Sequence, residues 1–558
     1  MKAKIYLVVV IILLIGGIAT SQYRKPDVHA GPDALLYFVG DTEHELTRMP
    51  ARFAQMSDAD EIAIGNELAK GFDNNELTKD PDALAMQQYV SRVGSTVAAH
   101  AHRKLPFKFH YVRDRSFVNA FALPGGHVVI GAGLIEVIDS EDELASVLGH
   151  EIEHIDHYHC AERVQTERAL HKLPLGSLAA IPVEIFQAGY SKTDELEADR
   201  EGVRLAAIAG YSPEAAVRLF QKFDELYHRT QNPSSNPQEE VSRVIVDSIS
   251  GYFRSHPPSR DRIEQIQQLI ATEKFQTHEQ ETPLETDYIL KSWLAEDSFQ
   301  EHKFEKAISL AAKALHSKSD YAAARRLRAE SEFLLARFSE AAPDYQDLLN
   351  HHVNLAIADR YADVLAAASR AQAAAQYAEW LSTAHAEETV SSSLRANLAG
   401  LRLLVGSKAD AQQVAAKALS ESDGDVIARL GKWYYRSGDY AQSVDLLQAA
   451  VELRPNNNEY QLQLAWALIE QQKFESCLSR LNTVASSEAV MARAVASWRA
   501  KEPDPALSEF NAVTREDAYW KNPTWTGSLY APSVGIAIKQ MGDESEKRHQ
   551  AALKPHPH

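Results

Sequence analysis

Two histidines separated by one helical turn, with a glutamate beside the first, make residues 150–154 a candidate metal site. The stretch reads His150-Glu151-Ile152-Glu153-His154 and lies in a proline-free run whose apolar residues recur at helical spacing. Residues four apart share one face of a helix, so both imidazoles can bind one ion. Zinc accepts two such nitrogens and an oxygen and leaves one position for water. We predict that Glu151 acts on that water. The alternative is a solvated helix face with incidental histidines.

A second acidic stretch, about forty residues later, supplies the carboxylates that such a site needs. Glu195 and Asp199 lie four residues apart in a run that Ser191 or Thr193 can cap as a helix. They therefore share one helix face. We predict that one carboxylate is the third zinc ligand and that the other orients a ligand imidazole. Taken alone, the same pattern is typical of an ordinary acidic helix N-terminus.

The elements that position these residues are mostly helical, with short strands between them. Residues 57–97 have a helical pattern, and Phe107–Val112 alternates apolar and polar residues as a strand does. Val128–Ile130 is β-branched, is flanked by glycines and follows a Pro124-Gly125-Gly126 turn. Because proline and glycine suit an edge strand better than a central one, we predict that Val128–Ile130 lies at the edge of the sheet.

His256 stands out because two prolines follow it directly. It comes after a polar loop at residues 229–240 and before Arg262 on the next predicted helix. The prolines restrict the backbone and could hold the imidazole in place. The alternative is a surface loop histidine.

Residues from about 57 to 270 resemble the M48 family of zinc metalloproteases. The matching segments are Asn119–Gly126, His150–His154 followed by His159, Glu195–Asp199, and His256-Pro-Pro with Arg262. The resemblance implies an α+β zincin-type domain, mostly helical with a small sheet. It implies one zinc ion per chain, bound by His150, His154 and Glu195.

The resemblance also implies the remaining roles. Glu151 would be the catalytic base, and Asp199 would hydrogen-bond to a ligand histidine. His256 and Arg262 match the family's segment near the metal. We predict that His256 either occupies the fourth zinc position as a latch or, alone or with Arg262, stabilises the oxyanion. Glu153, at a position often small in the family, is expected to face away from the metal. An extended substrate would add to the predicted edge strand, and the substrate-binding residues would be Asn119, Gly125, Gly126, Val128 and Ile130.

From about residue 285 the chain changes to a repeating helical composition. Phe304 and Phe338 occupy equivalent places 34 residues apart, and so do Tyr440 and Phe474. This period resembles tetratricopeptide (TPR) repeats, so we predict an all-α solenoid over residues 285–515 with about six or seven helix pairs. A plain helical bundle is the alternative. Residues 516–558 do not repeat and would be a C-terminal cap or tail that closes the solenoid or packs on the protease domain, 57–275.

The N-terminus predicts export. Lys2 and Lys4 precede an uncharged run that ends in small residues, so residues 1–21 read as a signal peptide, or as an N-terminal anchor if uncleaved, before an extension at 22–56. The net charge of −19 argues against nucleic acid as a partner. The two cysteines imply no disulfide framework.

The whole architecture is similar to periplasmic proteases of the BepA type, which take part in outer-membrane protein assembly. This resemblance implies a periplasmic zinc endopeptidase that cleaves misfolded or stalled envelope proteins. The TPR groove would recruit extended protein substrates or a partner protein, and contact with the membrane would occur only through an N-terminal anchor. The rival reading is a TPR-based chaperone or assembly factor whose protease site is latched most of the time.

Overall fold

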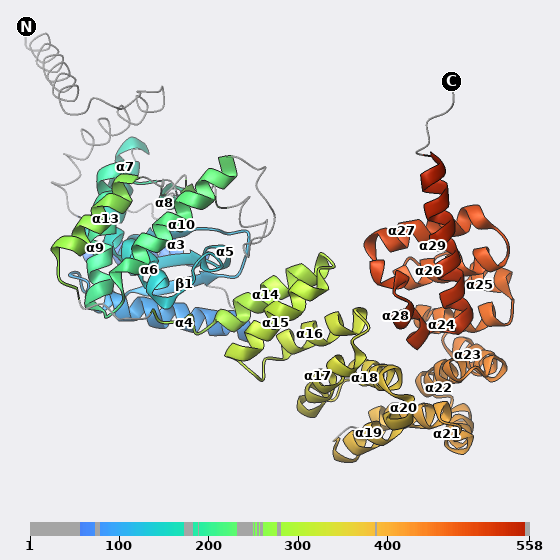
Figure 1. Cartoon of the computed structure of the whole chain (residues 1–558). Helices are drawn as coiled ribbons and strands as arrows, with labels where there is room; N and C mark the ends of the chain where they lie inside the picture. The colour runs from blue at the N-terminus through green and yellow to red at the C-terminus, as the bar shows by residue number, and fades with distance from the viewer. Residues whose placement is uncertain are drawn as a thin grey trace, which may run out of the picture. The chain divides into compact units, whose positions relative to one another are not determined.

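The computed structural model describes residues 56–72, 79–171, 182–187, 189–231, 249, 252–253, 256, 260–275, 281–384 and 388–552. The chain divides into two compact units, Met1–Thr286 and Asp287–His558 (Figure 1). The predicted signal or anchor, residues 1–21, lies outside the described residues, as does nearly all of the extension at 22–56. Among the helices of the described part, none is long and apolar enough to cross a membrane.

The described sheet of the first unit has three strands in the order β1-β3-β2. They are β1 (Lys108–Val112), β2 (Ala120–Leu123) and β3 (His127–Gly131). β3 pairs in parallel with β1 and antiparallel with β2. The prediction that Val128–Ile130 is an edge strand is therefore wrong, because these residues lie in the central strand and are fully buried.

The Pro-Gly-Gly segment that suggested an edge strand forms a tight 3-10 turn, η2 (Pro124–Gly126), between β2 and β3. Gly125 has a φ of 75°, and a Cβ there would lie 2.5 Å from the Ile62 Cα. Only glycine fits a left-handed backbone so close to another helix. The Pro-Gly-Gly sequence thus correctly predicted a turn. It did not indicate which strands pair with β3, the strand that follows the turn.

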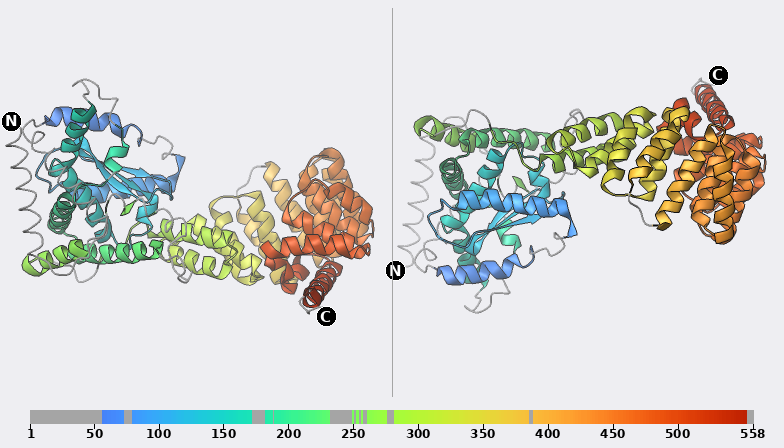
Figure 2. Two further views of the ribbon diagram at one scale, coloured as in Figure 1. Left: turned by 90° about the horizontal axis from the view of Figure 1, so that it is seen from above. Right: turned by 90° about the horizontal axis from the view of Figure 1, so that it is seen from below.

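Helices surround this sheet (Figure 2). The long helix α6 packs against both α9 and β2. The chain that leads into the second unit is attached to the first turn of α6, where Glu141 N donates to Thr282 O and Thr282 N donates to Asp142 Oδ2. The helices are α3 (Asp58–Ala69), α4 (Pro81–Ala98), α5 (Ala132–Ile135), α6 (Glu141–Asp156), α7 (His159–His171), α8 (Glu184–Gln187), α9 (Lys192–Ile208), α10 (Pro213–Gln231) and α13 (Arg260–Thr272).

The second unit is helical throughout its described residues, which confirms the predicted all-α class. The four aromatic residues that defined the 34-residue period each begin a helix: Phe304 α15, Phe338 α17, Tyr440 α23 and Phe474 α25. The helices are α14 (Asp287–Gln300), α15 (Phe304–Ser317), α16 (Ala322–Leu334), α17 (Phe338–His351), α18 (Leu355–Ala368), α19 (Arg370–Thr383), α20 (Glu388–Leu404), α21 (Lys408–Glu421), α22 (Gly424–Ser437), α23 (Tyr440–Leu453), α24 (Asn458–Glu470), α25 (Phe474–Leu481), α26 (Ser487–Arg499), α27 (Pro503–Glu516), η4 (Ala518–Lys521), α28 (Pro523–Leu529) and α29 (Pro532–Ala552).

Residues 517–531, which we call the closing segment, pack onto the repeats of the same unit. The Trp525 ring lies 6.0 Å from Phe333, and the Tyr530 ring lies 4.9 Å from Trp466. Arg436 Nη2 donates to Ser528 O at 2.9 Å. These contacts join one short segment to α16, α22 and α24, and Trp520 and Trp525 of the segment are buried.

Candidate metal centre

Two helices, α6 and α9, carry the predicted ligands, and each begins with a serine cap. Ser140 Oγ accepts from Glu143 N at the start of α6, and Ser191 Oγ accepts from Asp194 N at the start of α9. Acidic residues fill both first turns, where they complement the helix dipole. Of the two capping residues considered for α9, the structure therefore uses Ser191.

The close approach of α6 and α9 depends on a pair of glycines. A Cβ on Gly202 would lie 2.7 Å from His150 N, and a Cβ on Gly149 would lie 2.7 Å from Gly202 O. Real Cβ atoms are essentially never closer than 3.0 Å to other atoms. The two backbones therefore meet directly beside His150, which brings the histidines of α6 to the carboxylates of α9.

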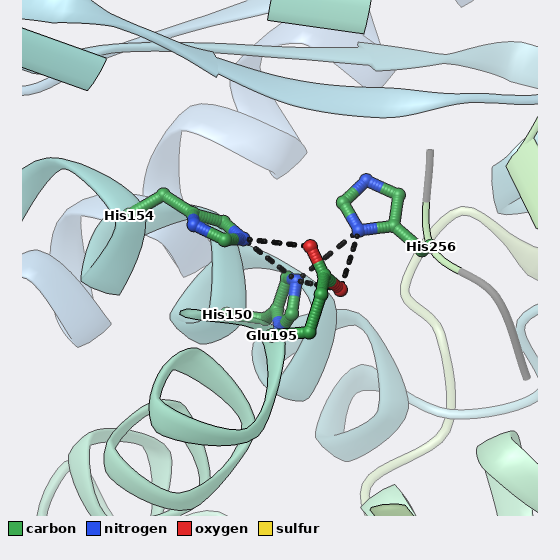
Figure 3. Close-up of side chains that lie close together, drawn as sticks. All are labelled: His150, His154, Glu195 and His256. Atoms are coloured by element: carbon green, nitrogen blue, oxygen red, sulfur yellow. Dashed lines mark hydrogen bonds and ion pairs between the residues drawn. The ribbon is translucent and has the colours of Figure 1, made fainter. Parts of the chain in front are cut away.

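Four buried side chains converge on one point: His150, His154, Glu195 and His256 (Figure 3). His150 Nε2 lies 3.1 Å from His154 Nε2 and 3.3 Å from His256 Nδ1. Glu195 Oε2 lies 3.1 Å from His256 Nδ1, and Glu195 Oε1 lies 3.5 Å from His154 Nε2. One potential ligand atom of each residue lies within 4.8 Å of all the others.

These separations fit a tetrahedral zinc site. Zinc bonds of about 2.0–2.1 Å to nitrogen and oxygen place neighbouring ligand atoms about 3.3 Å apart. The close pairs here are 3.1 to 3.5 Å apart, and the four ligand atoms all lie within 4.8 Å of one another. Three nitrogens and a carboxylate are also the donor types that zinc prefers. The buried Glu195 Oε1 has no hydrogen-bond partner, as expected of an atom that faces an ion. The residues present therefore fit zinc.

Neighbouring side chains fix the orientation of each histidine on α6. His150 Nδ1 lies 2.9 Å from Asp199 Oδ1, which turns the other ring nitrogen toward the cluster. Arg262 holds Asp199 in turn through Nε at 2.6 Å and Nη2 at 2.7 Å. His154 Nδ1 lies 3.0 Å from His159 Nδ1.

Three aromatic or imidazole neighbours of the cluster have roles that sequence reasoning missed. Tyr190 stacks on His154 with ring centroids 3.9 Å apart, and Tyr252 lies 4.9 Å from His256. His159 matched the family pattern, but nothing in the sequence indicated that it would contact His154. The His-x-x-x-x-His spacing of His154 and His159 was the only feature of the sequence that could have indicated this contact. Tyr190 gave none.

Burial and neighbouring charges shift the pKa values of the clustered residues, lowering those of Glu195 and His154 and raising that of His150. Burial opposes ionisation of Glu195, but His256 and Arg262 hold its pKa well below the usual range. Burial holds the pKa of His154 well below its usual value. Burial also opposes ionisation of Asp199, and Arg262 lowers its pKa. An ionised carboxylate and a neutral imidazole are the forms that bind a metal ion.

Glu151 lies beside the cluster without joining it. Its side chain is fully buried, neither carboxylate oxygen has a hydrogen-bond partner, and His256 Nε2 is 3.6 Å from Oε1. Burial raises the pKa of Glu151. Glu153, by contrast, pairs with His157 Nδ1 at 2.7 Å and is not among the four clustered residues.

Arg262 is engaged by carboxylates rather than directed at a substrate. Besides Asp199, its Nη2 lies 3.3 Å from Glu195 Oε2, and its guanidinium lies 4.6 Å above the Phe220 ring. The side chain is almost fully buried. This arrangement favours a positioning role for Arg262 over direct stabilisation of an oxyanion.

The predicted substrate-binding residues lie in β3, in the η2 turn and directly before β2. Asn119 is buried before β2, where its backbone oxygen accepts from Gly131 N at 2.9 Å. Gly125 and Gly126 form the η2 turn against α3, and Gly125 N donates to Glu61. Val128 and Ile130 lie in the central strand, so their edges are already paired.

Comparison with known proteins gives two family matches. Residues 84–270 match the model of peptidase family M48, and residues 434–496 match a tetratricopeptide-repeat model. The chain therefore carries a peptidase M48 domain and tetratricopeptide repeats, as the motifs and the 34-residue period predicted.

Individual relatives match over the protease part. The putative beta-barrel assembly-enhancing protease of Vibrio cholerae is 29% identical over 195 residues, which cover 31% of this chain and 40% of that protein. The mitochondrial metalloendopeptidase OMA1 of Schizosaccharomyces pombe is 28% identical over 193 residues, which cover 33% of this chain and 52% of that protein. The chain thus spans about half or less of the relatives' length. A tetratricopeptide repeat protein from Parabacteroides merdae covers 46% of this chain and 98% of its own, with 13% identity and a TM-score of 0.28.

Proposed function

We propose that this chain, which carries a peptidase M48 domain and tetratricopeptide repeats, is an exported zinc-dependent endopeptidase that cleaves misfolded or stalled envelope proteins in the periplasm. The observation that carries the proposal is the convergence of His150, His154, Glu195 and His256 beside the unpartnered carboxylate of Glu151. The names of the protease relatives support the same reaction class.

In the proposed mechanism, His150, His154 and Glu195 hold one zinc ion per chain. When bound there, zinc lowers the pKa of a water molecule and polarises the peptide carbonyl. Glu151 takes the proton of the attacking water and passes it to the leaving amine. Asp199 and Arg262 keep the His150 ring oriented throughout.

Glu151→Gln tests this function, because the amide has nearly the same shape but cannot take a proton. Cleavage of an unfolded protein substrate should fall by roughly 10²–10⁴-fold, while zinc content and thermal stability persist. Glu153→Gln is the matched control, since Glu153 lies on the same helix and pairs with His157 instead of facing the cluster. Residual activity within a few-fold of the unsubstituted chain would remove Glu151 from the role of base.

A substrate would bind as an added strand, but β3 offers no free edge. We place the substrate at the outer edge of β2 (Ala120–Leu123), the strand that packs against α6. Within the described sheet this edge has no partner strand, but all four β2 residues are buried and α8 packs against β2, so a peptide must displace what covers the edge. An extended peptide that forms main-chain hydrogen bonds with β2 would lie beside α6, the helix that contains His150 and Glu151.

A second function, assembly factor with a latched protease, is favoured by the position of His256. Its Nδ1 takes the fourth corner of the cluster, which the attacking water needs, while its Nε2 faces Glu151. In this arrangement the repeats bind protein partners and the protease works only after His256 moves. A partner biases that step only by binding the open and closed states differently.

His256→Ala separates the latch from oxyanion stabilisation. Removing a latch should raise basal cleavage and reduce the number of imidazole ligands of zinc seen by X-ray absorption, because water takes the place of His256, whereas removing an oxyanion donor should lower cleavage. His157→Ala serves as the control, because His157 is partly exposed and pairs with Glu153 outside the cluster. Unchanged coordination together with no gain in cleavage would rule the latch out.

A further inference from the structure

His159 meets the side of the His154 ring that faces away from the ligand cluster. It is the first residue of α7, and only 5% of it is exposed. Its Nδ1 lies 3.0 Å from Nδ1 of His154. The other ring nitrogen of His154, Nε2, lies 3.1 Å from His150 Nε2 and 3.5 Å from Glu195 Oε1. His154 therefore turns one nitrogen toward the cluster and the other toward His159.

The two facing nitrogens can share only one proton. A neutral imidazole has one N–H donor and one acceptor nitrogen. When Nε2 of His154 binds an ion, the ring proton must lie on Nδ1, so that nitrogen donates. Nδ1 of His159 must then accept, because two N–H groups only 3.0 Å apart would repel each other. The proton of a neutral His159 therefore lies on its Nε2.

Two carboxylates of α9 face this Nε2 of His159. The nitrogen is 3.6 Å from Asp194 Oδ1 and 3.5 Å from Glu197 Oε2. These distances are longer than an ordinary hydrogen bond, so the carboxylates act mainly through their charge. Because an ionised carboxylate cannot donate, both favour the tautomer of His159 that carries its proton on Nε2. The acids on either side of Glu195 thus favour the form of His159 that accepts from His154.

A second contact holds the plane of the His154 ring without distinguishing its nitrogens. Tyr190 stacks on this ring with centroids 3.9 Å apart and an angle of 16° between the planes. Tyr190 is held in turn by α7, where Cys160 Sγ lies 3.3 Å from its hydroxyl and Arg163 lies 4.2 Å from its ring centroid. Stacking is the same for either tautomer of His154. The contact that distinguishes the two tautomers is the one with His159.

We propose that His159 is a positioning residue of the metal centre, which accepts a hydrogen bond from Nδ1 of His154 and so directs Nε2 of His154 to the ion. The inference rests on the proposed function, since it takes His154 as a zinc ligand. His150 has a carboxylate, Asp199, in the equivalent place. A carboxylate accepts in any orientation, whereas an imidazole accepts at Nδ1 in only one tautomer. The pair His154 and His159 therefore depends on the acids of α9 as well.

Two amide substitutions of His159 separate this role from packing. Asparagine carries Oδ1 where histidine has Nδ1, so His159→Asn keeps an acceptor for His154. Glutamine places its oxygen one atom further out, near the position of Nε2, so His159→Gln keeps none there. Competition with a chromophoric chelator should show zinc affinity about 10–100-fold lower in His159→Gln and within about threefold of the unsubstituted chain in His159→Asn. His159→Phe keeps a ring without an acceptor and should resemble His159→Gln.

Substitution of Co²⁺ for zinc gives a spectroscopic measurement that does not depend on cleavage. The visible absorption bands of bound Co²⁺ report the arrangement of its ligands. The spectrum of His159→Asn should match that of the unsubstituted chain, whereas the bands of His159→Gln and His159→Phe should shift because the His154 ring is no longer oriented. His157→Gln is the matched control, because His157 pairs with Glu153 outside the cluster. It should change neither the spectrum nor zinc affinity.

Two results would overturn this inference. Equal zinc affinity and equal Co²⁺ spectra in all three His159 variants would show that the contact does not position His154. An equal loss in His159→Asn and His159→Gln would show that His159 acts through packing alone. If His159→Gln does not fold, the comparison of His159→Phe with His159→Asn still decides. A chain that binds no zinc at all would overturn the proposed function too, whereas zinc-dependent cleavage that is unaffected by all three variants would overturn this inference alone.

Discussion

Gly202→Ala tests whether the contact between α6 and α9 builds the metal centre. The new Cβ would lie 2.7 Å from His150 N and 2.9 Å from Gly149 C, whereas ordinary contacts begin at 3.4 Å. Because the obstructing atoms are backbone, the two helices must separate locally by about 0.7 Å to relieve the clash. Metal ligands tolerate displacements of about 0.2 Å. Glu195 on α9 could then no longer meet His150 and His154 on α6 at zinc distances.

Two quantities should change in Gly202→Ala. Overpacking should lower the free energy of unfolding by about 1–3 kcal/mol. Zinc affinity and kcat/KM should fall by about 10–100-fold, the range seen when the support of metal ligands is disturbed. A competition titration with a chromophoric chelator measures the zinc affinity. Urea unfolding of the metal-free chain measures the free energy of unfolding.

Gly71→Ala is the matched control, because Gly71 is exposed in the same unit and its Cβ would meet only Leu68 O, at 3.9 Å. It should leave zinc affinity unchanged. If Gly202→Ala also kept full zinc affinity and unfolded within 0.5 kcal/mol of the unsubstituted chain, the argument from the helix contact would be refuted. A loss of stability without a loss of zinc affinity would limit the glycine pair to a packing role.

The purified chain should contain about one zinc ion, and His154→Ala or Glu195→Ala should lose it; full zinc content in either variant, measured by atomic emission, would disprove the ligand assignment. Glu332→Gln should stabilise the second unit more at pH 8 than at pH 5. Burial raises the pKa of Glu332 from 4.5 to about 7, so the folded state holds its proton more tightly and stability falls as the pH rises from about 4.5 to 7. The gain at pH 8 should reach about 2–3 kcal/mol in thermal unfolding, and an equal gain at both pH values would contradict it.

The four-residue spacing of side chains on helices allowed the candidate metal centre to be predicted from the sequence. His150 and His154 share a helix face, as do Glu195 and Asp199, so their spacing alone indicated which side chains could meet one ion. The 34-residue period predicted the helical repeats for the same reason: Phe304 and Phe338 occupy equivalent positions, each at the start of a helix, in neighbouring repeats. Zinc binding itself stays a prediction.

Contacts between distant segments could not be read in this way. The prediction that Val128–Ile130 is an edge strand was wrong because the glycines before Val128 indicate a turn. They do not indicate which strands lie on either side of β3. No sequence pattern indicates that Tyr190 stacks on His154, which lies 36 residues earlier in the chain. The importance of Gly149 and Gly202 becomes clear only when the contact between α6 and α9 is known. The partners of the closing segment were undecided for the same reason.

The closing segment also sets an order of events during synthesis. A ribosome adds about 5–20 residues per second, and Ser528 lies 92 residues after Arg436, to which it binds. The helices around Arg436 therefore leave the ribosome roughly 5–20 seconds before the segment that covers them. Until the closing segment follows, Tyr435 lacks the hydrogen bond that its hydroxyl accepts from Ala531 N at 3.0 Å. Refolding of the complete chain from denaturant has no such interval, so it should aggregate less than the same chain stalled before residue 517.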